Sequence, residues 1–97
     1  MRHFVVTITF LSPFESFGEA VGRHGAFLTE GYDAGLLLVS GPRTSKTGGI
    51  VVARAESEAA LRTYMDRDPF KLEGLADYEI AEFSPTMSVP ILASWVA

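Results

Sequence analysis

The first regular feature of the chain is an alternation of side chains near its start. Every second residue between positions 4 and 11 is large and apolar: Phe4, Val6, Ile8 and Phe10. Because successive side chains of a strand point to opposite faces, this spacing predicts a β-strand with one strongly buried face. Ser12 and Pro13 then end the strand. His3, on the opposite phase, is expected to be an exposed strand residue.

The next segment, residues 14–34, has the period of a helix. Mainly apolar and aromatic side chains recur every three or four residues and predict one amphipathic stripe, made of Phe17, Val21, His24, Leu28 and Tyr32. Gly31 and Gly35 mark the end of this helix. His24 is therefore expected at the centre of the stripe, pointing into the interior.

Two apolar runs, residues 36–40 and 50–53, flank a polar segment that contains several glycines. This segment starts with Gly41-Pro42 and ends with Gly48-Gly49, and such residues favour turns. We therefore expect two strands joined by a long hairpin loop.

A second helix is predicted after Ser57, whose hydroxyl can cap it and which has glutamates on both sides. One face of this helix carries Leu61, Tyr64, Met65 and Asp68. Pro69 disfavours helical geometry at Asp68, so the helix should end there. A short turn over residues 70–75 and a final strand over residues 78–83 complete the pattern.

The predicted order of elements is strand, helix, strand, strand, helix, strand. This βαββαβ order is typical of a ferredoxin-like sandwich, an α+β fold in which both helices cover one face of a four-stranded antiparallel sheet. The chain has 97 residues, of which 47% are hydrophobic and 21% are charged. That length and composition fit a single domain over residues 1–97.

The sheet face away from the helices is also predicted to be rather apolar, since it carries Val5, Thr7, Thr9, Ala81 and Phe83. Such a face is unfavourable in water, and the same face of a second copy is the simplest cover. The apolar tail, residues 85–97, is expected to pack in this homodimer or higher homo-oligomer, or along its own sheet edge. A monomer whose tail covers its own sheet is the alternative.

Charge and composition exclude several classes of function. Eight basic and twelve acidic residues give a net charge of -4 with no basic cluster, which argues against nucleic-acid partners. Cysteine is absent, which excludes disulfides and thiolate chemistry. No apolar segment approaches the roughly 20 residues that span a membrane, so no membrane partner and a cytoplasmic location are expected.

No metal or cofactor is expected either. The two histidines, His3 and His24, are far apart in sequence and fall short of a usual metal-ligand set. The glycines over residues 41–49 lack the order of a nucleotide-binding loop. A small-molecule ligand is the partner that remains.

His24 and Asp68 are the candidate catalytic residues. Because both predicted helices pack on one sheet face, the two side chains can meet beneath the sheet. A carboxylate beside an imidazole fixes the ring's tautomer, which suits general acid/base chemistry near neutral pH. A structural role is the competing interpretation, because histidines on apolar faces are often satisfied core residues and Asp before Pro often ends a helix.

Other polar residues are weaker candidates. Ser40, at a strand end, could donate a hydrogen bond to a ligand, and Tyr32 and Tyr64 could line a pocket. Arg43 and Lys46 in the hairpin loop could attract an anionic substrate, although charged loops are usually only solvated.

In order and spacing these residues resemble the YciI-like (YCII-related) family over nearly the whole chain. The resemblance lies in His24 with Phe27-Leu28, Gly35-Leu36-Leu37, Ser40-Gly41-Pro42, Ser57-Glu58 and Asp66-Arg67-Asp68-Pro69-Phe70. It implies a dimeric α+β barrel of ferredoxin-like subunits, with the family's His-Asp pair at His24 and Asp68 and its Gly-Pro turn at Gly41 and Pro42. Many relatives carry an arginine where this chain has Val21, and here Arg23 lies beside the histidine instead.

Most of that family has no assigned reaction, but similar proteins include dehydrochlorinases of chlorinated hydroxyquinols, and related muconolactone isomerases share the barrel. The resemblance thus implies an isomerase or a lyase of dehydrochlorinase type that acts on a small cyclic or aromatic-derived metabolite. His24 would be the general acid/base and Asp68 its orienting partner, with substrate bound by Ser40, Gly41, Pro42 and Tyr64. The alternative is a non-catalytic dimeric module that binds a small ligand or a partner protein.

Overall fold

Strand β1 (Arg2–Phe10) is the centre of the sheet. In the computed structural model, which describes residues 1–97, it pairs antiparallel with β3 (Gly48–Ala55) on one side and with β4 (Ala76–Phe83) on the other. Strand β2 (Leu37–Pro42) pairs with β3 and completes the order β2-β3-β1-β4. Each predicted strand is present, with its ends at most two residues from the predicted ones.

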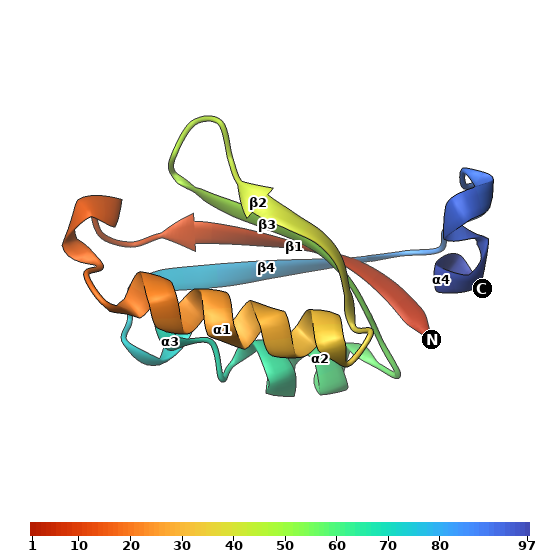
Figure 1. Ribbon diagram of the computed structural model, residues 1–97, viewed down its shortest axis with the longest axis horizontal. Helices are drawn as coiled ribbons and strands as arrows, with labels where there is room; N and C mark the ends of the chain where they lie inside the picture. The colour runs from red at the N-terminus through yellow and green to blue at the C-terminus, as the bar shows by residue number, and fades with distance from the viewer.

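The helices between the strands all lie on the same face of this sheet (Figure 1). They are α1 (Ala20–Asp33), α2 (Glu58–Met65) and the short α3 (Pro69–Leu72). Ser57 caps α2 as predicted, since its hydroxyl oxygen accepts the N–H of Ala60 at 3.0 Å. The ferredoxin-like βαββαβ architecture is therefore confirmed.

The first helix is shorter than the predicted span of residues 14–34. Residues Phe14–Ser16 form a separate 3-10 turn, η1, and Gly18 adopts a left-handed φ of 57°, which interrupts the helical path. Helix α1 consequently begins at Ala20. Its buried positions are Ala20, Phe27 and Gly31, so the centre of its core-facing stripe lies about one position away from the predicted one.

The core lies between the sheet and the helices. The side chains of Phe4, Val6 and Ile8 on β1 are buried, as the alternation predicts. Leu61 and Met65 from α2 pack into the same cluster. Burial of each such side chain stabilises the fold by roughly 1.5–3 kcal/mol, so these alternating positions determine which face of β1 turns towards the helices.

The tail after β4 runs beyond the end of the sheet, on the side where the N-terminus also lies (Figure 1). It forms the turn η2 (Pro90–Leu92) and the short helix α4 (Ala93–Val96). The carbonyl oxygen of Trp95 accepts hydrogen bonds from His3 Nε2 at 3.0 Å and from Arg54 Nη1 at 3.1 Å. His3 is thereby only 4% exposed, so the prediction of an exposed strand residue is wrong. Sequence periodicity around position 3 carries no information about a contact that comes from the other end of the chain.

None of the helices combines the length and the hydropathy that a membrane-spanning helix requires.

Gly31 marks the point where α1 comes closest to its neighbours. A Cβ at this position would overlap the Tyr64 hydroxyl and lie 2.8 Å from the Leu37 side chain. We predict that Gly31→Ala lowers the free energy of unfolding by about 1–3 kcal/mol, measured by urea denaturation, although alanine is the better helix former.

The matched control is Gly25→Ala on the same helix, where an added Cβ meets no atom within 4 Å. This change should leave stability unaltered or raise it by about 0.5–1 kcal/mol. Equal effects of the two substitutions would contradict the close packing at Gly31.

Candidate active site

Asp68 lies completely buried between α2 and α3. It precedes Pro69, which keeps it out of helical geometry (φ -59°, ψ 127°) and serves as the first residue of α3. In this position Asp68 caps α3, because its Oδ1 accepts the N–H of Phe70 at 2.9 Å. The Asp-Pro pair that ends one helix thus also directs a carboxylate into the interior.

His24 reaches the same carboxylate from α1. Its Nδ1 lies 2.9 Å from both Oδ1 and Oδ2 of Asp68. An ionised carboxylate only accepts hydrogen bonds, so Nδ1 carries the hydrogen and Nε2 of the neutral ring keeps its lone pair. The His24 ring stacks on Phe70 with centroids 4.0 Å apart and planes 5° from parallel. The structure therefore brings together the two residues that the sequence singled out. Phe70 packs on one face of the imidazole ring, and Asp68 binds its Nδ1 edge.

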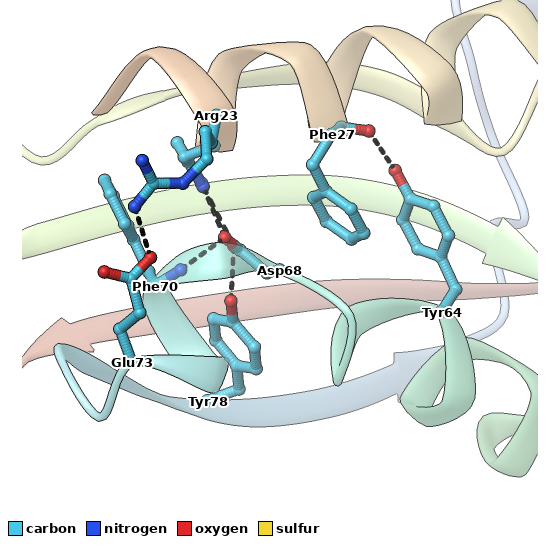
Figure 2. Close-up of polar contacts among 8 residues, drawn as sticks. Arg23, Phe27, Tyr64, Asp68, Phe70, Glu73 and Tyr78 are labelled. Atoms are coloured by element: carbon cyan, nitrogen blue, oxygen red, sulfur yellow. Dashed lines mark hydrogen bonds and ion pairs between the residues drawn. The ribbon is translucent and has the colours of Figure 1, made fainter. Parts of the chain in front are cut away.

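A third side chain, Tyr78 on β4, completes the surroundings of the carboxylate. Its hydroxyl donates to Oδ2 of Asp68 (Figure 2). Burial, the hydrogen bond to Asp68 and the negative charge of Asp68 all raise the pKa of Tyr78, so the hydroxyl stays a donor. Three donors compensate for the cost of burying the Asp68 charge.

Sequence reasoning missed Tyr78 as a site residue. Its one signal is its register: Tyr78 pairs with Ile8 on the helix-facing side of the sheet, where a hydroxyl needs a partner.

His24 borders a pocket of about 240 Å³ beside α1, β2, β3 and α3. The pocket is mostly apolar, and the rings of Phe10, Phe14 and Phe70 form part of its wall. No Asp, Glu, Lys or Arg side chain borders it. The side chain of His24 is 17% exposed, whereas that of Asp68 is not exposed at all. A molecule in this pocket would therefore meet the imidazole and not the carboxylate.

Val21 and Leu28, which share the predicted stripe with His24, also line the pocket. These residues of the predicted stripe, which were expected in the core, thus form the side of the pocket that α1 contributes. Arg23 does not border the pocket and instead pairs with Glu73 across α1 and α3 at 2.6 Å (Figure 2).

Ser40, Gly41 and Pro42, expected to bind substrate, also line this pocket. A bulge in β2 turns Ser40 towards the helices. The hydroxyl of Ser40 is hydrogen-bonded to that of Tyr32 on α1. Strand β2 therefore supplies a polar group at the wall opposite α1.

The bulge is visible in the pairing of β2 with β3, where Leu37 is opposite Ala53 but Val39 is opposite Val52. The extra residue, Leu38, reverses the alternation of side chains beyond it. Val39 thus faces the side away from the helices.

Tyr64 is not among the residues that line the pocket. Its hydroxyl donates to the carbonyl oxygen of Phe27 at 2.8 Å, and the two rings stack at 4.4 Å (Figure 2). Burial raises the pKa of Tyr64 to about 12, with a smaller contribution from the charge of Glu30. The structure therefore places Tyr64 in the contact between α1 and α2, away from the other predicted substrate-binding residues.

No three His, Asp or Glu side chains come close enough together to form a metal-binding group.

These features define a class: a ferredoxin-like α+β chain with a His-Asp pair beside an apolar pocket. The chain belongs to the YCII-related domain family, whose family model matches residues 7–84. No curated protein sequence is similar enough to match the chain.

Solved structures share the fold. The 5-chloro-2-hydroxyhydroquinone dehydrochlorinase TftG from Burkholderia phenoliruptrix AC1100, solved with 2,5-dihydroxybenzoquinone, has 20% sequence identity and a TM-score of 0.71. That match covers 84% of this chain and 92% of the dehydrochlorinase. SnoaB, a cofactor-independent oxygenase from Streptomyces nogalater, has 17% identity and a TM-score of 0.51, over 92% of this chain and 96% of its own. At these identities the likeness establishes the fold alone.

The raised pKa of Tyr64 predicts a loss of stability at alkaline pH. The folded-state value of about 12 lies above the ordinary value of 10.0, so the folded protein holds this proton more tightly than the unfolded chain does. The contribution is complete below pH 10 and is lost as the pH rises towards 12. Between these values, the unfolding free energy of the wild type should fall more steeply with pH than that of Tyr64→Phe.

Denaturant unfolding at a series of pH values measures both slopes. Tyr78, whose pKa is also raised, is present in both proteins and cancels in the comparison. Parallel curves for the two proteins would contradict the prediction.

Proposed function

We propose that this protein is an enzyme in which His24 moves a proton on a small cyclic or aromatic-derived substrate, in a reaction of the isomerase or lyase type. One observation carries the proposal: one ring nitrogen of His24 is held by a buried carboxylate, while the other makes no hydrogen bond to the protein and the ring borders a pocket. A histidine that only completes a core would have both nitrogens paired inside it.

The chemistry follows from the hydrogen bond at Nδ1. With the hydrogen fixed there, neutral His24 acts as a base through Nε2, and Asp68 stabilises the imidazolium that forms. Return of the proton to a different atom of the substrate is an isomerisation. Departure of a leaving group such as chloride from the deprotonated substrate is an elimination: the electron pair left by the proton forms the new double bond, chloride leaves with its bonding pair, and the imidazolium of His24 later releases the proton to water, so the net loss is one proton and one chloride ion.

The pocket supports a single-ring substrate. Its volume of about 240 Å³ lies below the roughly 300–1,000 Å³ of pockets that hold drug-sized ligands. The rings of Phe10, Phe14 and Phe70 suit a flat apolar surface, and Ser40 offers a hydroxyl for a substrate oxygen. The ligand and the substrate named for the dehydrochlorinase are also single-ring compounds that carry hydroxyl or carbonyl oxygens.

We further propose that two copies associate through the sheet face away from the helices. This face carries Val5 and Val52 on the two inner strands, Phe83 at the end of edge strand β4 and Val39 on edge strand β2. Met87 and Ile91 of the tail are also strongly exposed. A two-fold dimer that buries about 800 Å² per subunit would remove these side chains from water.

Release of chloride from 5-chloro-2-hydroxyhydroquinone, measured under anaerobic conditions, tests the catalytic proposal. Wild-type protein should release chloride and bind 2,5-dihydroxybenzoquinone in calorimetry. His24→Gln should lose at least about 100-fold in turnover while its fold and its affinity for the quinone change little. Asp68→Asn, which retains a capping side chain, should also lose turnover.

The control is His3→Gln, which alters the other histidine on the far side of the sheet and should preserve turnover. Undiminished turnover in His24→Gln would overturn the catalytic role. Quinone binding without chloride release by the wild type would favour the ligand-binding alternative for this substrate class.

The dimer proposal predicts different effects of two exposed apolar-to-acidic changes. Val39 is 55% exposed on the sheet face and Leu72 is 71% exposed on α3. Val39→Asp should weaken dimer association by at least roughly tenfold in sedimentation equilibrium, because two unpaired carboxylates enter the interface. Leu72→Asp should leave association unchanged. A monomeric wild type, or equal effects of both changes, would contradict the proposed interface.

A further inference from the structure

Tyr78 is a partly buried polar side chain of the site, and the proposed function gives it no role. It rises from β4 towards Asp68, on the opposite side of the carboxylate from α1 (Figure 2). We infer that Tyr78 is a positioning residue that lowers the basicity of His24 by sharing the carboxylate of Asp68. The inference rests on the proposed function, since it concerns how readily the same histidine takes and releases a proton.

The first argument is the orientation of the carboxylate. Oδ1 of Asp68 is held by the N–H of Phe70 and Oδ2 by the hydroxyl of Tyr78. With one oxygen fixed by each donor, both lie 2.9 Å from Nδ1 of His24. The terminal torsion of an aspartate has a broad energy profile, so without Tyr78 only Oδ1 would have a donor besides His24 to fix its position.

The second argument is electrostatic. Each donor to a carboxylate stabilises its negative charge and leaves less of that charge to attract a neighbouring imidazolium. The hydroxyl of Tyr78 thus competes with protonated His24 for Asp68. The result is a histidine that is oriented by a carboxylate without being held permanently in its protonated form, as a reversible acid/base requires.

The other charged groups around Tyr78 do not replace this contact. The ammonium of Lys71 lies 5.8 Å from the centre of the Tyr78 ring and pairs with Asp77. The charge of Asp66, the residue after α2, also acts on Tyr78, and Arg23 on α1 pairs with Glu73, the residue after α3. Neither that pair, Lys71 nor Asp66 forms a hydrogen bond with Asp68 or His24.

Tyr64 provides a matched comparison. It is also a partly buried tyrosine whose hydroxyl donates into the interior, but it donates to the carbonyl of Phe27. Tyr64→Phe and Tyr78→Phe therefore each remove one tyrosine hydroxyl that donates a hydrogen bond. Only the second change removes a donor from Asp68.

The test is a pH titration of the histidine ring signals by NMR in the wild type and in both variants. In Tyr78→Phe the midpoint of the His24 signals should move to higher pH by roughly 0.5–1 unit, a part of the full effect of one hydrogen bond to a charged group, because Phe70 and His24 still donate to Asp68. The His3 signals, and the His24 signals of Tyr64→Phe, should keep their wild-type midpoints. An unchanged His24 midpoint in Tyr78→Phe, or equal shifts in both variants, would overturn the inference.

A measurement on the wild type covers the case in which Tyr78→Phe does not fold. The hydroxyl proton of Tyr78 should change its chemical shift with the same pH midpoint as His24, and a shift independent of pH would overturn the inference.

With the chlorinated substrate, the acid limb of the pH–rate profile should move in the same direction as the NMR midpoint in Tyr78→Phe, with little change in KM. Absence of chloride release from the wild type bears on the proposed function alone, because the NMR measurements need no substrate.

Discussion

The buried carboxylate of Asp68 is the constraint on which the site and much of its surroundings depend. A charge removed from water is tolerated only when donors surround it, and here the donors come from three elements: His24 on α1, Phe70 in α3 and Tyr78 on β4. The need to satisfy one side chain therefore fixes α1 against α3 and both against the sheet. Loss of any one donor would leave a buried charge partly unpaired, which explains why the imidazole is so closely confined.

The burial of Asp68 also gives the two sides of the His24 ring different surroundings. One edge of the ring faces a carboxylate that no ligand can reach, and the ring borders an apolar pocket that contains no other ionisable side chain. His24 is thus the one acid/base group that borders the pocket. Phe70 contributes twice, because its N–H binds Asp68 while its ring stacks on the imidazole.

Features that depend on neighbours along the chain could be predicted from the sequence. The alternation at Phe4, Val6 and Ile8 identified the buried face of β1, and Ser57 identified the start of α2. The meeting of His24 and Asp68 also followed, because two helices on one sheet face bring their inward side chains together. Features that depend on an unusual backbone conformation, or on a distant contact that the order of helices and strands does not imply, could not be predicted.

Three examples show this limit. The left-handed turn at Gly18 moved the start of α1, and the hydroxyl of Tyr64 donates to a backbone carbonyl of α1 that the sequence pattern does not single out. The burial of His3 depends on Trp95, which is 92 residues away in sequence. None of these three features can be inferred from the local pattern of apolar and polar positions.

The bulge in β2 determines both which residue of this strand lines the pocket and which lies on the exposed face of the sheet. Because of it, Val39 faces the exposed side of the sheet and Ser40 faces the pocket, the reverse of what an unbroken alternation from Leu37 would give. A molecule bonded to Ser40 and a second subunit seated on Val39 would act on adjacent peptide units of one edge strand. Thermodynamic linkage requires any effect of occupancy on association to be matched by an equal effect of association on affinity, so this strand is where cooperativity between subunits would originate.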